Sequence, residues 1–122
     1  MGKVKNKRIV IPVFNSEYKV IVVWGNEKLL QKTAKDYQYP DDIPYTLDTS
    51  NRGCCFNRHE CHPIIYLPKR PQTSEEIGTL AHEAVHAVNH IFDKISEPIR
   101  DTEVFAHSVG AVVRKVLYES YN

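Results

Sequence analysis

The sequence has no long apolar run, no excess of one charge and no paired set of cysteines. Its purely apolar runs end after about five residues, whereas a membrane-spanning helix needs roughly 20. The 16 Lys and Arg residues balance the 15 Asp and Glu residues, so the chain offers no basic face for nucleic acid. The start of the sequence lacks the apolar segment of a signal peptide, and three cysteines favour a reducing compartment. We therefore expect a soluble cytoplasmic protein with no nucleic-acid or membrane partner.

The length and composition indicate one domain. A chain of 122 residues with 42% hydrophobic and 25% charged residues has the size and composition of a single globular unit. No internal repeat or low-complexity linker divides it. We therefore treat residues 1–122 as one domain.

The first half of the chain reads as a hairpin followed by a helix. Residues 8–14 and 18–24 are β-branched and aromatic runs, and Pro12 places the first of them at a sheet edge. Residues 27–37 have the spacing of a short amphipathic helix. Residues 38–51 are rich in Pro, Asp and Asn, which predicts an irregular connection with at most one short strand.

The second half predicts another hairpin and then two helices. Residues 54–57 and 63–67 would pair around the polar tip at residues 58–60. A capping box of Thr73 and Glu76 starts a helix at about Ser74 that runs to about Asp93. A last helix is expected from Ser96-Glu97-Pro98 to about Tyr118. This order predicts an α+β fold, a small mixed or antiparallel sheet with two long C-terminal helices on one face.

Residues 82–86 of the first long helix read His-Glu-Ala-Val-His, the H-E-x-x-H pattern. Residues four apart on a helix differ by about 40°, so the imidazoles of His82 and His86 can meet one metal ion. Glu83 lies about 60° further round and can act on a water at that ion. Zinc prefers this donor set, with a third protein ligand and one open position. A coincidental match is the alternative, and the capped helix and the preceding strand argue against it. The helix also carries an apolar stripe away from the histidines, formed by Ile77, Leu80, Ala84, Val88, Ile91 and Ile95.

Together with the stretch Asp101-Thr102-Glu103-Val104-Phe105-Ala106, this motif resembles a minimal gluzincin metallopeptidase. It is most similar to the small HExxH proteins of phages and mobile elements, over about residues 63–117. The resemblance implies a zincin-like core and a zinc-dependent peptidase acting on a peptide or protein. Zn²⁺ would be held by His82, His86 and Glu103, and Glu83 would be the general base. A metzincin is excluded, because Asn89 replaces its glycine and Phe92 stands where its third histidine would be.

The third ligand and the oxyanion donor are less constrained by the sequence. On one helix Asp101 and Glu103 differ by about 200°, and Asp101 is better explained as a cap. Glu103 shares its face with Ala106, His107 and Gly110, of which two are small enough to let the HExxH helix approach. His107 is expected to be a catalytic donor beside the site, and a three-histidine site with His107 as ligand is the alternative.

Two further features of the sequence bear on the site. Tyr66, His90 and His107 compete as oxyanion donor, and the strand at residues 64–67 is expected to be the edge along which a peptide binds. A structural zinc in the cluster of Cys54, Cys55, His59, Cys61 and His62 is disfavoured, because adjacent cysteines on a strand point to opposite faces.

An alternative function comes from a different class. A non-catalytic regulatory or interaction protein could retain the metal site without turnover, and a small chain has little room for substrate subsites. Glu83 favours the enzyme, because a purely structural metal site has no need of a carboxylate base beside the metal.

Overall fold

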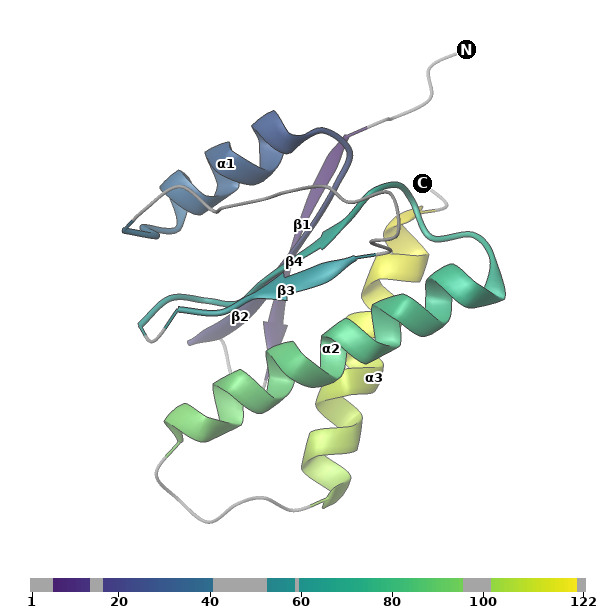
Figure 1. The fold of residues 1–122 in the computed structure, drawn as a ribbon. Helices are drawn as coiled ribbons and strands as arrows, with labels where there is room; N and C mark the ends of the chain where they lie inside the picture. The colour runs from purple at the N-terminus through teal and green to yellow at the C-terminus, as the bar shows by residue number, and fades with distance from the viewer. Residues whose placement is uncertain (1–5, 14–16, 41–52, 59, 96–101, 121–122) are drawn as a thin grey trace.

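In the part of the chain that the structure describes, four strands form one mixed sheet with helices on both of its faces (Figure 1). The computed structural model describes residues 6–13, 17–40, 53–58, 60–95 and 102–120. The strands are β1 (Lys7–Val13), β2 (Tyr18–Trp24), β3 (Cys54–Phe56) and β4 (Ile64–Leu67), in the order β1-β2-β4-β3. The helices are α1 (Glu27–Asp36), α2 (Ser74–Lys94) and α3 (Thr102–Ser120). The fold is α+β, and the predicted mixed sheet with two long C-terminal helices is confirmed.

The two faces of the sheet are covered by different helices. Alternate residues of a strand point to opposite faces. Val22 of β2 and Ile65 of β4 face α2 and α3, whereas Val23 and Tyr66 face α1. The sequence predicted helices on one face, and the structure adds α1 on the other (Figure 1). Both faces of the central strands are therefore buried.

The sheet edges agree with the sequence at one side and differ at the other. β1 lies at an edge, as Pro12 predicted, and pairs antiparallel with β2. The prediction that the strand at residues 64–67 is an edge is wrong. β4 lies between β2, with which it is parallel, and β3, with which it is antiparallel. All four of its residues are buried, as expected of an interior strand, so among the described strands the edge on that side is β3.

The second hairpin is confirmed, with Cys55 opposite Ile65 in the register of β3 and β4. Three predicted features lie outside the described residues: the course of the chain at residues 41–52, His59 at the hairpin tip, and the start of the last helix at residues 96–98. The described part of that helix begins at Thr102 and ends at Ser120.

The helix that carries the motif begins with the predicted capping box. The Glu76 N–H donates to Thr73 Oγ1 at 3.1 Å, and the Thr73 N–H donates to Glu76 Oε1 at 3.0 Å. Two orphan N–H groups of the first turn are thereby satisfied. This cap fixes where α2 starts and therefore which residues face the sheet.

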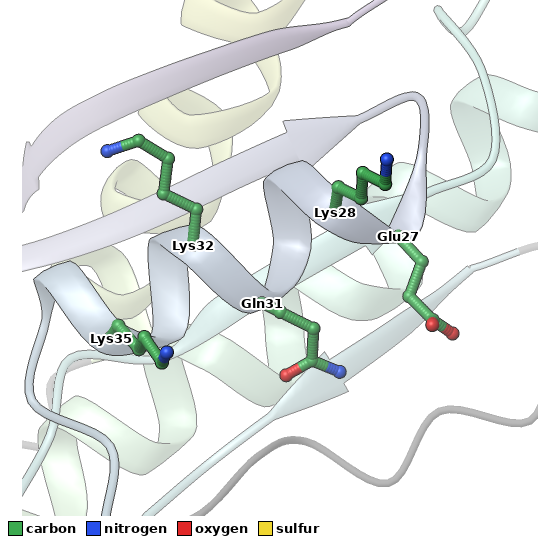
Figure 2. A pocket seen from close by; sticks show the side chains of 5 residues that line it. All are labelled: Glu27, Lys28, Gln31, Lys32 and Lys35. Carbon is green, nitrogen blue, oxygen red and sulfur yellow. The ribbon is translucent and has the colours of Figure 1, made fainter.

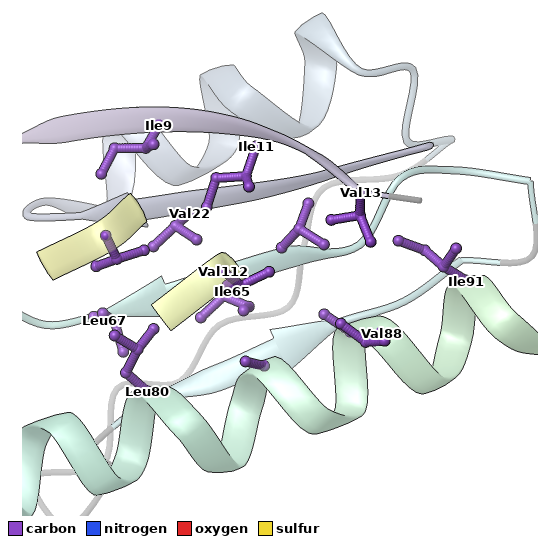
Figure 3. Close-up of a cluster of buried hydrophobic side chains, with 14 of the residues drawn as sticks. Ile9, Ile11, Val13, Val22, Ile65, Leu67, Leu80, Val88, Ile91 and Val112 are labelled. Carbon is purple, nitrogen blue, oxygen red and sulfur yellow. The ribbon is translucent and has the colours of Figure 1, made fainter. Parts of the chain in front are cut away.

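α2 packs on the sheet through an apolar face and on α3 through an aromatic pair. Figure 3 shows Leu80 of α2 directed at Leu67 of β4, within the buried cluster. Phe92 and Phe105 pack edge to face with their ring centroids 5.6 Å apart.

None of the helices in the described part of the chain is long and apolar enough to cross a membrane.

Candidate metal centre

The two histidines of the motif lie side by side on the solvent-facing side of α2. Their Nε2 atoms are 3.3 Å apart, and the His82 side chain is 68% exposed. Two nitrogens bound to a tetrahedral zinc at about 2.0–2.1 Å are separated by about 3.3–3.4 Å. The distance between the two Nε2 atoms is therefore the one that two ligands of the same zinc ion need.

Glu83 lies at the boundary between this face and the core. Its Oε2 is 4.0 Å from His82 Nε2, and its side chain is only 12% exposed. Burial raises the pKa of the Glu83 carboxyl, and the nearby His82 and His86 act in the opposite direction. A carboxylate that holds its proton more firmly is a stronger base, which suits proton transfer near neutral pH.

The charge of Glu83 acts on two thiols of β3. Burial, and after it the charge of Glu83, raises the pKa of Cys55 to about 12 and that of Cys54 to about 11. Cys55 packs in the cluster facing α2 and Cys54 in the cluster facing α1, so the prediction that they point to opposite faces is confirmed. Cys61 also packs on the α1 side, away from Cys55, and all three cysteines are free.

The residues predicted on the last helix are not brought to the pair. Glu103 and His107 lie on the exposed side of α3, while Val112 and Val116 on its opposite side are buried in the core. A Cβ on Gly110 would meet only the Arg114 guanidinium at 3.2 Å, so this face of α3 is not pressed against α2.

The position of Glu103 along the helix pair explains this separation. Phe105, in the same turn, contacts Phe92, which is ten residues and about 15 Å along α2 from His82. Among the described residues, no group of three or more His, Cys, Asp or Glu side chains is arranged to hold a metal. The assignments of Glu103 and His107 stay predictions. Asp101 lies outside the described residues.

The other two oxyanion candidates have structural partners. The Tyr66 hydroxyl donates to the carbonyl of Gly25 on the α1 side of the sheet, away from the histidines. His90 Nε2 is 3.1 Å from the Arg58 carbonyl, which can only accept, so this nitrogen carries the proton.

A second contact from α2 reaches the same hairpin. One turn after His90, the Lys94 ammonium donates to the Cys61 carbonyl at 2.9 Å. These two contacts, which we call the hairpin clasp, join α2 to the tip of the β3–β4 hairpin. The clasp fixes edge strand β3 beside the motif, and the sequence pattern alone gave no sign of it.

A hollow opens beside the motif toward the start of α2. We call it the Gly78 hollow. Its volume is about 540 Å³, within the range of small-ligand sites. Two motif residues form one end of it, and the remaining lining comes from the first turns of α2 and the residue before β3. It is lined by Gly53, Ser74, Glu75, Gly78, Thr79, His82 and Glu83.

Another hollow lies on the opposite side of the molecule. Figure 2 shows that its lining side chains all come from α1: Glu27, Lys28, Gln31, Lys32 and Lys35. The sheet separates α1 from α2, so this hollow is not part of the motif site.

Comparisons with known proteins give no relative for this arrangement. No protein-family model, no curated protein and no solved structure matches the chain.

Proposed function

We propose that the protein is a zinc-dependent metallopeptidase of gluzincin type. The observation that carries this proposal is the 3.3 Å separation of the Nε2 atoms of His82 and His86, with the Glu83 carboxylate 4.0 Å from the first of them. This is the donor set and spacing that tetrahedral zinc takes, with a carboxylate beside it.

Two of the protein ligands that a zinc site needs are in place among the described residues. His82 and His86 would hold zinc, which when bound lowers the pKa of water and polarises a peptide carbonyl. Glu103 is proposed as the third ligand on the strength of the gluzincin resemblance. This assignment requires the first turn of α3 to shift toward the histidines, because the described arrangement keeps that carboxylate apart from them.

Glu83 is proposed as the general base and then the general acid. Its carboxylate takes a proton from the attacking water, and the same proton passes to the nitrogen of the leaving amine. Partial burial raises the pKa of this carboxyl, which makes it a better proton acceptor and a group able to keep the proton between the two steps.

The substrate is proposed to bind as an extended strand along β3. Among the described strands, β3 pairs with β4 along one edge only, and this strand contributes Cys55 to the cluster packed under α2. A peptide can add to such an edge through main-chain hydrogen bonds. β3 thus takes the substrate-binding role that the sequence predicted for β4.

The proposed compartment of the protein is the reducing cytoplasm, which fits its three free thiols.

The test is cleavage of a permanently unfolded protein by the purified chain. We expect cleavage with zinc, none after chelation, and recovery when zinc is returned. The Glu83→Gln variant keeps the shape of the side chain but lacks the base, so it should keep its zinc and cleave nothing. A zinc-loaded wild type with no activity on any unfolded substrate favours the non-catalytic alternative.

A further inference from the structure

We propose that His90 and Lys94, the α2 residues of the hairpin clasp, are positioning residues for the peptide. They hold the end of edge strand β3 at a fixed place along α2, so that a peptide added to β3 meets the proposed catalytic residues in one register. This inference rests on the proposed peptidase function and adds to it what orients the substrate.

The segment that contains β3 runs beside α2 and in the same direction as that helix (Figure 1). At one end, a Cβ built on Gly53 would lie 3.2 Å from the Thr79 side chain. At the other end, His90 Nε2 lies 3.1 Å from the Arg58 carbonyl oxygen. The helix rises about 16 Å from Thr79 to His90. An extended chain covers the same distance, about 16 Å, from Gly53 to Arg58. The two segments therefore keep one alignment over the whole length of the motif.

Within this alignment the motif lies opposite the middle of β3. Glu83 is about 6 Å along α2 from Thr79. Cys55 is about 7 Å along the strand from Gly53. The charge of Glu83 is, after burial, a cause of the raised pKa of the Cys55 thiol, which agrees with this placement. A peptide paired with β3 would therefore have its cleaved bond near Cys55, and on one side its further residues would reach Arg58.

The end of β3 beyond the motif depends less on packing than its middle does. Cys55 packs against the cluster under α2, and Phe56 packs against the cluster on the α1 side. The next two residues, Asn57 and Arg58, are exposed, so they bury little apolar surface. The position of this end relative to α2 therefore depends on hydrogen bonds.

The clasp supplies these hydrogen bonds, and both of its contacts hold the same turn. His90 donates to the Arg58 carbonyl, and Lys94 donates to the Cys61 carbonyl at 2.9 Å. The Cys61 N–H donates to the same Arg58 carbonyl at 3.0 Å, which closes the turn between the two contacts. Two side chains of α2 thus fix the main chain that continues β3.

A fixed edge matters for the affinity of a long peptide. A peptide adds to a strand edge through main-chain hydrogen bonds, and it binds more tightly where that edge is already ordered. Without the clasp, the chain at Asn57 and Arg58 would have to be ordered at each binding event, and that cost would lower the affinity of peptides that reach it. The chemical step, at His82, His86 and Glu83, would be unchanged.

The test compares three peptides of one sequence, which spans a bond that the zinc-loaded protein cleaves in an unfolded substrate. The core peptide has two residues on each side of the bond, and each longer peptide adds three residues on one side. In the wild type we expect one longer peptide, the one that reaches Arg58, to have a lower KM than the core peptide.

The variants of the clasp should remove this gain. His90→Ala and Lys94→Met should each raise KM for that longer peptide about fivefold, the factor expected for one hydrogen bond, at unchanged kcat and zinc content. KM for the core peptide, which does not reach Arg58, should stay unchanged.

Two further variants separate positioning from folding. His90→Gln keeps a side-chain N–H that can donate to the Arg58 carbonyl, so it should restore the wild-type KM. Lys7→Met removes a contact of the same kind as that of Lys94, an ammonium that donates to the Glu119 carbonyl at 3.2 Å, from β1 at the opposite edge of the described sheet. It should leave KM for all three peptides unchanged.

The outcomes separate the two proposals. A gain from peptide length that persists in both His90→Ala and Lys94→Met overturns the positioning role and leaves the peptidase function standing. The same follows if neither longer peptide has a lower KM than the core, or if Lys7→Met raises KM as much as Lys94→Met does. Absence of any cleavage by the zinc-loaded wild type overturns the peptidase function, and the positioning role with it.

Discussion

At the residue scale, the contact between His82 and His86 has two explanations. A measurement of zinc binding distinguishes between them. With Nε2 atoms 3.3 Å apart, one neutral imidazole can donate to the other, or both lone pairs can point at one ion. The two imidazoles already have the spacing that the ion needs. These two side chains therefore need little reordering to bind it.

The motif could be predicted from the sequence because its geometry is local. Residues four apart on any helix are neighbours, so His82 and His86 meet wherever α2 lies. The third ligand is not local in this sense. The place of Glu103 depends on how α3 crosses α2, which is set by contacts such as that of Phe92 with Phe105, and no short pattern encodes it.

The assignment of Glu103 gives a prediction at this scale. If its carboxylate is the third ligand, Glu103→Ala should weaken zinc binding at least tenfold, because a ligand is lost. His107→Ala, one turn along the same exposed face, should change zinc affinity less than threefold. Competition with a chromophoric chelator measures both affinities. The reverse order of effects would assign the ligand to His107 and make this a three-histidine site.

At the element scale, the local patterns set the helices and the hairpins but not the sheet order. The capping box at Thr73 and Glu76 is a short-range signal, and it predicted the start of α2 correctly. The four apolar residues of β4 indicate burial on both faces. Its parallel partner β2 lies some 40 residues earlier, so the pairing that makes β4 interior depends on distant contacts.

The hairpin clasp gives a second prediction. His90→Ala removes the donor to the Arg58 carbonyl, at a cost of about 1 kcal/mol. We expect faster hydrogen exchange of the Cys61 amide, which donates to the same carbonyl, with zinc content unchanged. The neighbouring Asn89→Ala serves as control, since its side chain is exposed. Equal exchange of this amide in both variants would show that the His90 contact does not hold the hairpin tip.

The cap of α2 gives a third prediction, on pH. Hydrogen bonds from the N–H groups of Thr73 and Gln72, with the Lys69 ammonium, lower the pKa of Glu76 to about 2. A folded-state pKa below the unfolded value means that the stabilisation is complete above about pH 4.5. It is lost as pH falls toward 2.

The Glu76→Gln variant keeps an acceptor for the cap but does not titrate. It should therefore lose less stability than the wild type between pH 4.5 and 2.5, measured by urea unfolding. Glu75→Gln, which removes the same charge from the same turn but not the capping residue, should keep the wild-type slope. A wild-type slope in Glu76→Gln as well would show that the cap does not depend on this charge.

At the scale of the whole molecule, a metal that binds only the folded chain should stabilise it. With free zinc at 100 times its dissociation constant the gain is about 2.7 kcal/mol. For a chain of 122 residues this corresponds to a rise in Tm of about 10 °C. Calorimetry with and without zinc measures the rise, and His82→Ala should abolish it. An equal rise in that variant would mean that zinc stabilises the fold from another site.

The central claim is that His82 and His86 hold one zinc ion. The zinc content of the purified protein after dialysis against trace zinc tests it most directly, by elemental analysis of the wild type beside His86→Ala. We predict one zinc per wild-type chain and none held by the variant, because loss of an imidazole leaves too few protein ligands. One zinc per chain in both proteins, or none in either, would contradict the claim.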